Sequence, residues 1–285
     1  MSRFDQKLAA GEGVVGTFSH LGGPAVAECL SLSGLDYVII DTEHGPFPDE
    51  STGEMIRAIE LHSAEAFVRV RDSSRAAVLH ALDLGARGII IPDVQSVEEA
   101  RRLVEYAKYY PLGARGFAFS RSAKYGFLPE LKQIGDYFTA TNQRTILMPQ
   151  CETAGALEHI EEIAALDGID GIFVGPYDLS VALGAPARFA TPRFAEALDR
   201  VIAACRASGK LAFIYANTRA YFAQGYQGAP IARIRPFWSR PFRACCRRNG
   251  TLQKNAKVRP PRSGNTSIKS GVIRIGRTPR FFTCC

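Results

Sequence analysis

The sequence predicts an α/β protein with a (β/α)8 TIM-barrel fold. Seven short runs of apolar and β-branched residues alternate with longer amphipathic stretches, and strand–helix units in succession form either a barrel or a doubly wound sheet. Several runs are apolar throughout, as expected for strands of a parallel sheet buried on both faces. A glycine-rich turn of the GxGxxG type follows none of them, which counts against a dinucleotide-binding doubly wound sheet.

The expected strands follow from these runs in chain order. The sequences VVGTF, YVII, AFVRV, GIII, TILM, GIFV and LAFIY combine β-branched and other apolar residues with the lengths of buried strands. They occupy residues 14–18, 37–40, 66–70, 88–91, 145–148, 171–174 and 211–215.

The expected helices lie between these strands, where apolar residues recur at helical spacing. Gly34, Gly85, Gly168 and Gly209 mark the return from a helix to the next strand, and helix C-termini favour glycine there. The helices cover residues 24–33, 51–62, 75–84, 97–108, 130–141, 154–166, 192–208 and 219–224.

An eighth strand is the one element of a barrel that the sequence does not supply. It should begin near Tyr226, but the segment GYQGAPIARIRPFW is interrupted by Pro230 and Pro236 and is rich in arginine. We therefore expect a barrel domain at residues 1–228 in which the eighth strand and the terminal helices are missing or replaced.

Charge divides the chain at the same place. Residues 229–285 hold 14 Lys and Arg and no acidic residue, so the net +7 of the whole chain leaves −7 for residues 1–228. The basic total is therefore no indication that the body binds nucleic acid. The favoured explanation of the tail is a change of reading frame. The alternatives are a disordered basic tail that binds phosphates and an ordered extension.

Composition excludes two further classes of protein. No apolar run reaches the ~18 residues of a transmembrane helix, and the start, MSRFDQKLAAGEG, lacks the apolar stretch of a signal peptide. The body contains only Cys29, Cys151 and Cys205, widely spaced, and no CxxC motif. A reduced, cytoplasmic protein is expected.

Polar residues gather at the ends of the expected strands. Because the strands of a parallel barrel all point one way, these side chains converge on its C-terminal rim, where barrel enzymes place their active sites. They are Asp41, Glu43 and His44 after the second strand, Arg69 in the third, Gln150 and Glu152 after the fifth, and Asp178 after the sixth.

Two of these residues, Glu152 and Asp178, are carboxylates from neighbouring strand ends. Their oxygens suit a hard divalent cation such as Mg²⁺ or Mn²⁺. Both also precede helical stretches, where acidic residues act as helix N-caps. The residues alone leave both interpretations open.

His44 follows Asp41 by three residues in a tight loop. A carboxylate beside an imidazole fixes its tautomer and raises its basicity, as a general base requires. A loop histidine that bonds to a nearby backbone group is the alternative. The other histidines, His20 among them, are assigned no role.

Arg69 lies at a strand end, where a buried charge needs a partner. Its planar guanidinium matches a substrate carboxylate, and an ion pair with Glu43 or Glu152 is the alternative. The backbone N–H groups of Tyr177 and Asp178, at a possible helix start, can bind an anion or belong to an ordinary capped turn.

The segments DTEH, FVRV, PQCET and GIFVGPYDLS, in this order and spacing, resemble the HpcH/HpaI aldolase/citrate lyase family, and in particular its metal-dependent pyruvate aldolases. The resemblance runs from about Phe4 to about Gln227. It implies a TIM barrel that exchanges its last helix between subunits of a hexamer, an assembly that this C-terminus puts in doubt. Glu152 and Asp178 would hold the divalent metal: Mg²⁺, Mn²⁺ or Co²⁺.

The resemblance also implies roles for the other residues. Arg69 would bind the carboxylate or keto oxygen of pyruvate, and His44, oriented by Asp41, would be the acid/base group. Gln150 would lie beside the bound pyruvate or water, and the backbone at Tyr177 and at Asp178 would contact the pyruvate carboxylate.

The implied reaction is the reversible cleavage of a 4-hydroxy-2-oxo acid to pyruvate and an aldehyde, in aromatic or sugar-acid catabolism. One alternative is a lyase of the citrate lyase type that acts on a CoA thioester. The other is a defective, non-catalytic protein whose basic tail binds nucleic acid.

Overall fold

The computed structural model describes residues 2–216, 221 and 224–231. The predicted helix at residues 219–224 lies largely outside this part, as do the basic tail from residue 232 onward and any terminal helices. Within the described part, no helix has the length and the apolar run that a membrane crossing requires.

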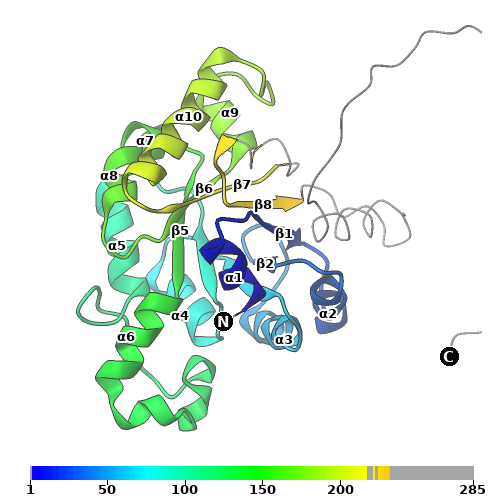
Figure 1. Cartoon of the computed structure of the whole chain (residues 1–285), viewed down its shortest axis with the longest axis vertical. Coiled ribbons are helices and arrows are strands. Elements are labelled where there is room, and N and C mark those ends of the chain that lie inside the picture. Colours follow the sequence, from blue (N-terminus) through cyan, green and yellow to red (C-terminus); the bar gives the residue numbers. More distant parts are fainter. Residues whose placement is uncertain (1, 217–220, 222–223, 232–285) are drawn as a thin grey trace, which may run out of the picture. The chain divides into compact units, whose positions relative to one another are not determined.

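Eight parallel strands close into a barrel in the order of the chain (Figure 1). The TIM-barrel prediction is confirmed. Six of the seven predicted strands begin and end within one residue of their predicted bounds, because their apolar runs are buried from the first residue to the last or nearly so, and β5 extends three residues beyond its predicted end. The strands are β1 Val14–Ser19, β2 Tyr37–Asp41, β3 Glu65–Arg69, β4 Gly88–Ile91, β5 Ile146–Cys151, β6 Gly171–Val174, β7 Leu211–Ile214 and β8 Gly228–Ile231.

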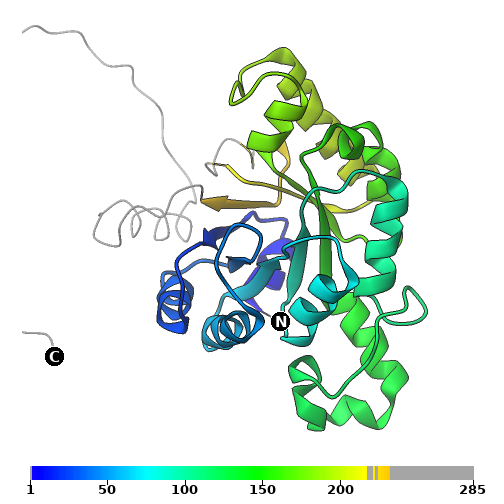
Figure 2. The same cartoon turned by 180° about the vertical axis from the view of Figure 1, so that it is seen from behind.

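Helices surround the barrel (Figure 2). The sequence did not predict α1, η1 or α9, and the predicted helix 154–166 divides into two at His159, which has non-helical backbone angles. The helices are α1 Arg3–Ala9, α2 Pro24–Leu32, α3 Asp49–Glu60, α4 Arg75–Asp83, α5 Val97–Ala107, α6 Ile134–Arg144, α7 Ala154–Glu158, α8 Ile160–Ala165, α9 Pro176–Ala182 and α10 Pro192–Ala207, with short 3₁₀ helices η1 Arg121–Gly126 and η2 Pro129–Lys132.

The prediction that the eighth strand is missing was wrong. Strand β8 runs parallel to β1, with Gly228 opposite Val14, and joins β7 at the pair Phe213–Gly228. A Cβ atom at Gly228 would lie 2.1 Å from the Phe213 ring, so only glycine lets this strand approach β7. Glycine and proline have low strand propensity. For this reason the strand was not predicted from its sequence. The predicted domain boundary at residue 228 therefore falls inside β8.

Aromatic side chains fill the N-terminal end of the barrel. Phe4, from α1, packs with ring centroids 5.9 Å from Tyr37 and 5.6 Å from Phe67, and Tyr37 lies 5.5 Å from Phe213. All four side chains are fully buried. Contacts of this kind add to the burial of large apolar surfaces, so this end of the barrel is closed by packed rings.

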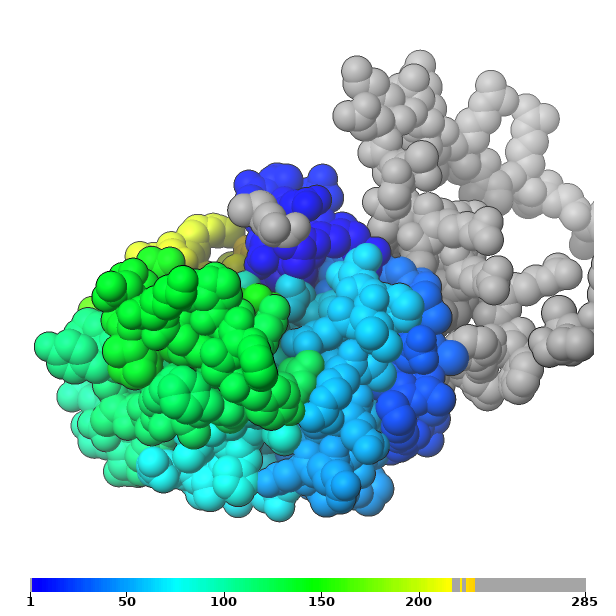
Figure 3. All heavy atoms as spheres, turned by 90° about the horizontal axis from the view of Figure 1, so that it is seen from below, coloured from blue at the N-terminus to red at the C-terminus, as the bar shows by residue number. Residues whose placement is uncertain are grey.

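A groove of about 1150 Å³ lies outside this closed end, between α1, α3 and the lobe formed by η1, η2 and α6. Figure 3 shows α1 in dark blue beside this green lobe. Its basic residues are largely paired: Arg87 Nη2 lies 2.8 Å from Asp5 Oδ1, and Arg121 contacts Glu60. These pairs tie the lobe and α1 to the rest of the barrel.

Candidate functional site

A second cavity, of about 390 Å³, opens at the other end of the barrel, where the strands have their C-termini. Sequence reasoning placed the site at this rim, and five of its residues reach the cavity wall. They are His44, Arg69, Gln150, Tyr177 and Asp178, and the rest of the lining is Phe18, His20, Phe173, Gly175, Pro176 and Tyr215.

Arg69 is held against the fully buried Asp41. Its Nε donates to Asp41 Oδ1 at 2.9 Å and its Nη2 to Oδ2 at 2.6 Å. Burial alone would raise the pKa of Asp41, but the hydrogen bonds and charge of Arg69 outweigh it and hold that pKa below its usual range. A guanidinium has five N–H donors, so donors remain for a ligand in the cavity that Arg69 lines.

Glu43 is the second carboxylate beside Arg69. Its Oε2 is buried, accepts no hydrogen bond from the described residues and lies 3.1 Å from Arg69 Nη1. Burial raises the pKa of Glu43, and the positive charge of Arg69 only partly offsets the effect. Arg69 thus forms a structural ion pair with Glu43, one of the two predicted alternatives, and a second ion pair with Asp41.

His20 is the second partner of Asp41, and the sequence analysis assigned it no role. Its Nε2 lies 2.7 Å from Asp41 Oδ2, and its ring stacks on Phe18 with an interplanar angle of 16°. Its position in the sequence could have indicated a role. His20 directly follows β1, so it lies at the same rim of the barrel as the predicted site residues.

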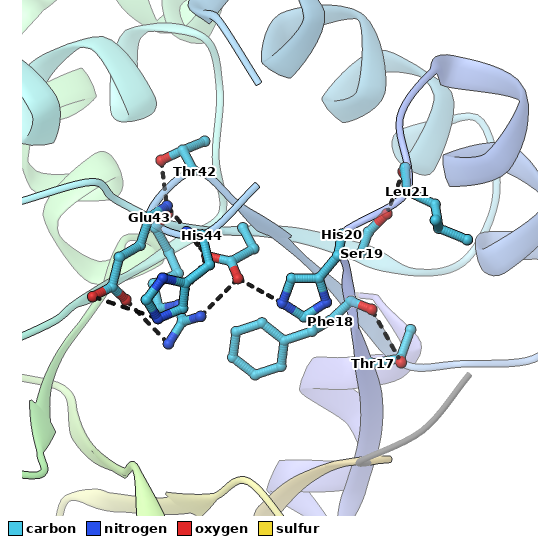
Figure 4. Close-up of polar contacts among 10 residues, drawn as sticks. Thr17, Phe18, Ser19, His20, Leu21, Thr42, Glu43 and His44 are labelled. Carbon is cyan, nitrogen blue, oxygen red and sulfur yellow. Dashed lines mark hydrogen bonds and ion pairs between the residues drawn. The ribbon is translucent and has the colours of Figure 1, made fainter. Parts of the chain in front are cut away.

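The expectation that Asp41 orients the His44 imidazole is not met in the structure. Asp41 Oδ1 accepts the backbone N–H groups of Glu43 at 3.2 Å and His44 at 3.4 Å, so it shapes the loop. The His44 side chain is 66% exposed, and its Nε2 lies 4.0 Å from Glu43 Oε1. Figure 4 shows the two imidazoles apart, with His20 on the Phe18 side and His44 beside Glu43.

Glu152 lies just behind the cavity wall and is only 7% exposed. Its Oε1 accepts the backbone N–H of Asp93 at 2.8 Å, and its Oε2 accepts the side-chain amide of Gln150. Burial raises the pKa of Glu152, and the charges of Asp178 and Glu43 add to the effect. Glu152 is not a helix cap, because the side chain of Thr153 caps α7.

The carboxylates of Glu152 and Asp178 and the amide oxygen of Gln150 form a set of oxygen donors that fits a divalent cation. Asp178 lies in the first turn of α9, whose N-cap is Gly175, and Gln150 Oε1 is buried with no hydrogen-bond partner among the described residues. No cluster of three or more His, Cys, Asp or Glu side chains suited to a metal occurs in the described ranges. Two carboxylates and an amide oxygen leave coordination positions for water and substrate, as hard cations prefer.

Gly175 is the point at which the site tolerates no side chain. A Cβ atom there would lie 2.5 Å from Glu152 Oε2 and 2.7 Å from Gln150 Nε2.

We expect Gly175→Ala to displace both groups and to lower kcat/KM by about 10²-fold, since misplacement by ~1 Å has effects of this size. Its φ of −93° suits alanine, so thermal unfolding should change little. Steady-state kinetics and calorimetry test this, with Gly135→Ala as control, because a Cβ there meets nothing within 4 Å. Unchanged kinetics would contradict the prediction.

Comparisons with known proteins identify similar chains. The model of the HpcH/HpaI aldolase/citrate lyase family matches residues 15–232. The 2-keto-3-deoxy-L-rhamnonate aldolase of Salmonella gallinarum is 33% identical over 211 residues, which cover 73% of this chain and 77% of that protein.

Solved structures are also similar to this chain. A family protein from Burkholderia cenocepacia has a TM-score of 0.74 at 30% identity, covering 81% of this chain and 92% of its own. An HpcH/HpaI aldolase from Desulfitobacterium hafniense has a TM-score of 0.73 at 30% identity, covering 81% and 90%. The citrate lyase beta subunit from Mycobacterium tuberculosis has a TM-score of 0.50 at 17% identity, covering 77% and 91%, and so shares only the fold.

Proposed function

The chain belongs to the HpcH/HpaI aldolase/citrate lyase family and is a carbon–carbon lyase of the aldolase type; from this premise we propose that it cleaves a 4-hydroxy-2-oxo acid reversibly to pyruvate and an aldehyde. One observation carries the proposal. At the C-terminal end of the barrel, Arg69, Gln150 and Asp178 line one cavity, and Glu152 lies directly behind Gly175 in its wall.

Glu152 and Asp178 are the residues proposed to hold a divalent cation, Mg²⁺ or Mn²⁺. When bound, such a cation supplies positive charge at the C2 oxygen of the substrate, where negative charge develops as the C3–C4 bond breaks. The buried position of Glu152 beside other carboxylates supports this assignment, because a cation there stabilises its ionised form.

Arg69 is proposed to bind the carboxylate or the C2 oxygen of the pyruvate part. Asp41 fixes the guanidinium through two parallel hydrogen bonds, so its remaining N–H groups are aimed before the substrate arrives. Donors that are already in place at the point where charge develops stabilise a transition state without reorganising. Gln150 is proposed to lie beside the bound pyruvate or water, and the backbone N–H groups of Tyr177 and Asp178, at the start of α9, to contact the carboxylate.

Cleavage also needs a group that takes the proton of the C4 hydroxyl. An imidazole suits this task near neutral pH, and two histidines, His20 and His44, line the cavity. The family resemblance favours His44, whose ring lacks a buried partner among the described residues.

Pyruvate release from a panel of 4-hydroxy-2-oxo acids tests the proposed function. The panel begins with 2-keto-3-deoxy-L-rhamnonate, the substrate in the name of the Salmonella relative, and includes acids that release small aldehydes and semialdehydes. A parallel assay with malyl- and citryl-type CoA thioesters covers the citrate lyase alternative. Release of pyruvate from at least one acid is expected. Cleavage of a thioester alone would overturn the proposal in favour of that alternative.

A further inference from the structure

We propose that Asp93 is a positioning residue for Glu152. The turn that Asp93 makes after β4 directs its backbone N–H at one oxygen of that carboxylate and so fixes the other oxygen for the cation. The inference rests on the proposed function, in which Glu152 holds a divalent cation. It concerns a residue that neither the sequence analysis nor the lining of the cavity singled out.

Asp93 has a backbone conformation that is rare outside glycine. Its φ is 54°, in the left-handed region, which aspartate and asparagine adopt more readily than other residues with a side chain. The other described residues of this kind are Lys124 and Tyr125, which line the groove at the opposite end of the barrel, and Ala187, which follows α9. Strain of this kind collects at functional sites and persists only where the surrounding structure enforces it.

The turn brings the N–H group of Asp93 to Glu152. The amide nitrogen of Asp93 lies 2.8 Å from Glu152 Oε1. Because a peptide group holds this oxygen, the second oxygen of the carboxylate is fixed as well. That oxygen, Oε2, accepts the side-chain amide of Gln150 and lies on the side of Gly175. Both of these residues line the cavity.

The side chain of Asp93 makes a different contact. It belongs to an exposed residue, and its Oδ1 accepts a hydrogen bond from the side-chain amide of Gln95 at 2.6 Å. The group that acts on Glu152 is the backbone N–H. The side chain at position 93 therefore matters for Glu152 through the backbone conformation that it permits.

Neighbouring contacts hold the turn against the segment that follows β5. The Thr153 hydroxyl donates to the carbonyl oxygen of Val94 at 2.6 Å, and Val94 is fully buried. A Cβ atom at Gly155 would lie 2.2 Å from the carbonyl oxygen of Gln95, so α7 approaches the turn as closely as glycine allows. The segment that begins with Glu152 thus meets three consecutive residues of the turn, and these contacts enforce its strained conformation.

The consequence of this arrangement is a contribution to metal affinity. A residue at position 93 that disfavours positive φ must turn its N–H away from Glu152 or disrupt the contacts of the turn. The carboxylate then loses the bond that fixes its Oε1, and Oε2 is no longer held at the cavity wall. Groups that orient a metal ligand in this way commonly contribute 10–100-fold to affinity for the metal.

A series of substitutions at position 93 tests the proposal through Mn²⁺ affinity, measured by titration calorimetry on the full chain without substrate. Asp93→Gly and Asp93→Asn both permit positive φ, and we expect each to bind Mn²⁺ within about threefold of the wild type. Asp93→Val strongly disfavours this backbone, because β-branched residues are outliers there. We expect it to weaken binding by about 10-fold or more, with Asp93→Ala in between. If Asp93→Val does not fold, the comparison of Asp93→Ala with Asp93→Gly carries the test.

Lys124→Val is the matched control for strain alone. Lys124 has a φ of 45° and lines the groove at the other end of the barrel, so valine there meets a similar backbone penalty away from the cavity. Thermal unfolding should shift downward in both valine variants. Mn²⁺ affinity should stay within about threefold of the wild type in Lys124→Val, because that substitution leaves the turn after β4 unchanged.

Two results would overturn the role of Asp93. The first is wild-type Mn²⁺ affinity in folded Asp93→Val or, where that variant does not fold, in Asp93→Ala. The second is a loss of affinity in Asp93→Gly as large as in Asp93→Val or Asp93→Ala, which would mean that the side-chain carboxylate acts rather than the backbone. Absence of Mn²⁺ binding in the wild-type protein would instead contradict the proposed metal site, so the two failures are distinguishable.

Discussion

Replacing Arg69 with lysine is expected to lower kcat/KM for pyruvate release by about 10²–10³-fold, the usual effect of removing one preorganised donor to a developing oxyanion. Lysine is a compact point charge and cannot donate two parallel bonds to Asp41 while it also meets a substrate oxygen. The variant keeps a positive charge beside Asp41, so that buried carboxylate is not left without a counterion.

Steady-state kinetics with saturating Mg²⁺ measure this effect, and circular dichroism verifies the fold. Arg71→Lys is the matched control. Arg71 lies two residues after the end of the same strand, but it forms an exposed ion pair with Asp49 at 3.2 Å. Near-normal kinetics of Arg69→Lys would reject recognition by the guanidinium and leave Arg69 a structural ion pair.

Glu152→Gln is expected to weaken Mn²⁺ binding by about 10²-fold or more, since even groups that only orient metal ligands contribute 10–100-fold. Glutamine has nearly the same shape and can still accept the Asp93 N–H, but it removes the negative charge that attracts the cation. Pyruvate release at a fixed Mn²⁺ concentration should fall with the affinity.

Titration calorimetry without substrate separates metal binding from turnover. Glu161→Gln is the control, because Glu161 lies on α8 and pairs at the surface with Arg200 at 2.7 Å. If Glu152→Gln bound Mn²⁺ as tightly as the wild type and yet lost activity, Glu152 would act on the substrate rather than on a metal.

The strands were predictable from the sequence because burial on both faces leaves apolar runs, as in the GIII of β4 and the GIFV of β6. Strand β8 was not, because its first residue must be glycine to clear the Phe213 ring. Strand propensity reflects how well a residue packs its own side chain, whereas Gly228 makes room for the side chain of Phe213 on the neighbouring strand.

The location of the site was predictable from the sequence, but the contacts between its charged side chains were not. Parallel strands bring Arg69, Gln150 and Asp178 to one rim whatever their neighbours are. Which side chains contact Asp41 depends on side-chain positions across three strands, and His20, 21 residues earlier in the chain, lies with its Nε2 2.7 Å from Asp41 Oδ2. The domain boundary at residue 228 and the change of reading frame inferred from the break in composition there stay predictions, and the family match ends at residue 232.

The most direct test of the central claim, a divalent-metal-dependent pyruvate aldolase, is pyruvate release by the metal-stripped protein before and after Mg²⁺ or Mn²⁺ is added back. With a 4-hydroxy-2-oxo acid that the wild type cleaves, we predict that release stops in excess chelator and returns when the cation exceeds the chelator. Full release in excess chelator would contradict the account.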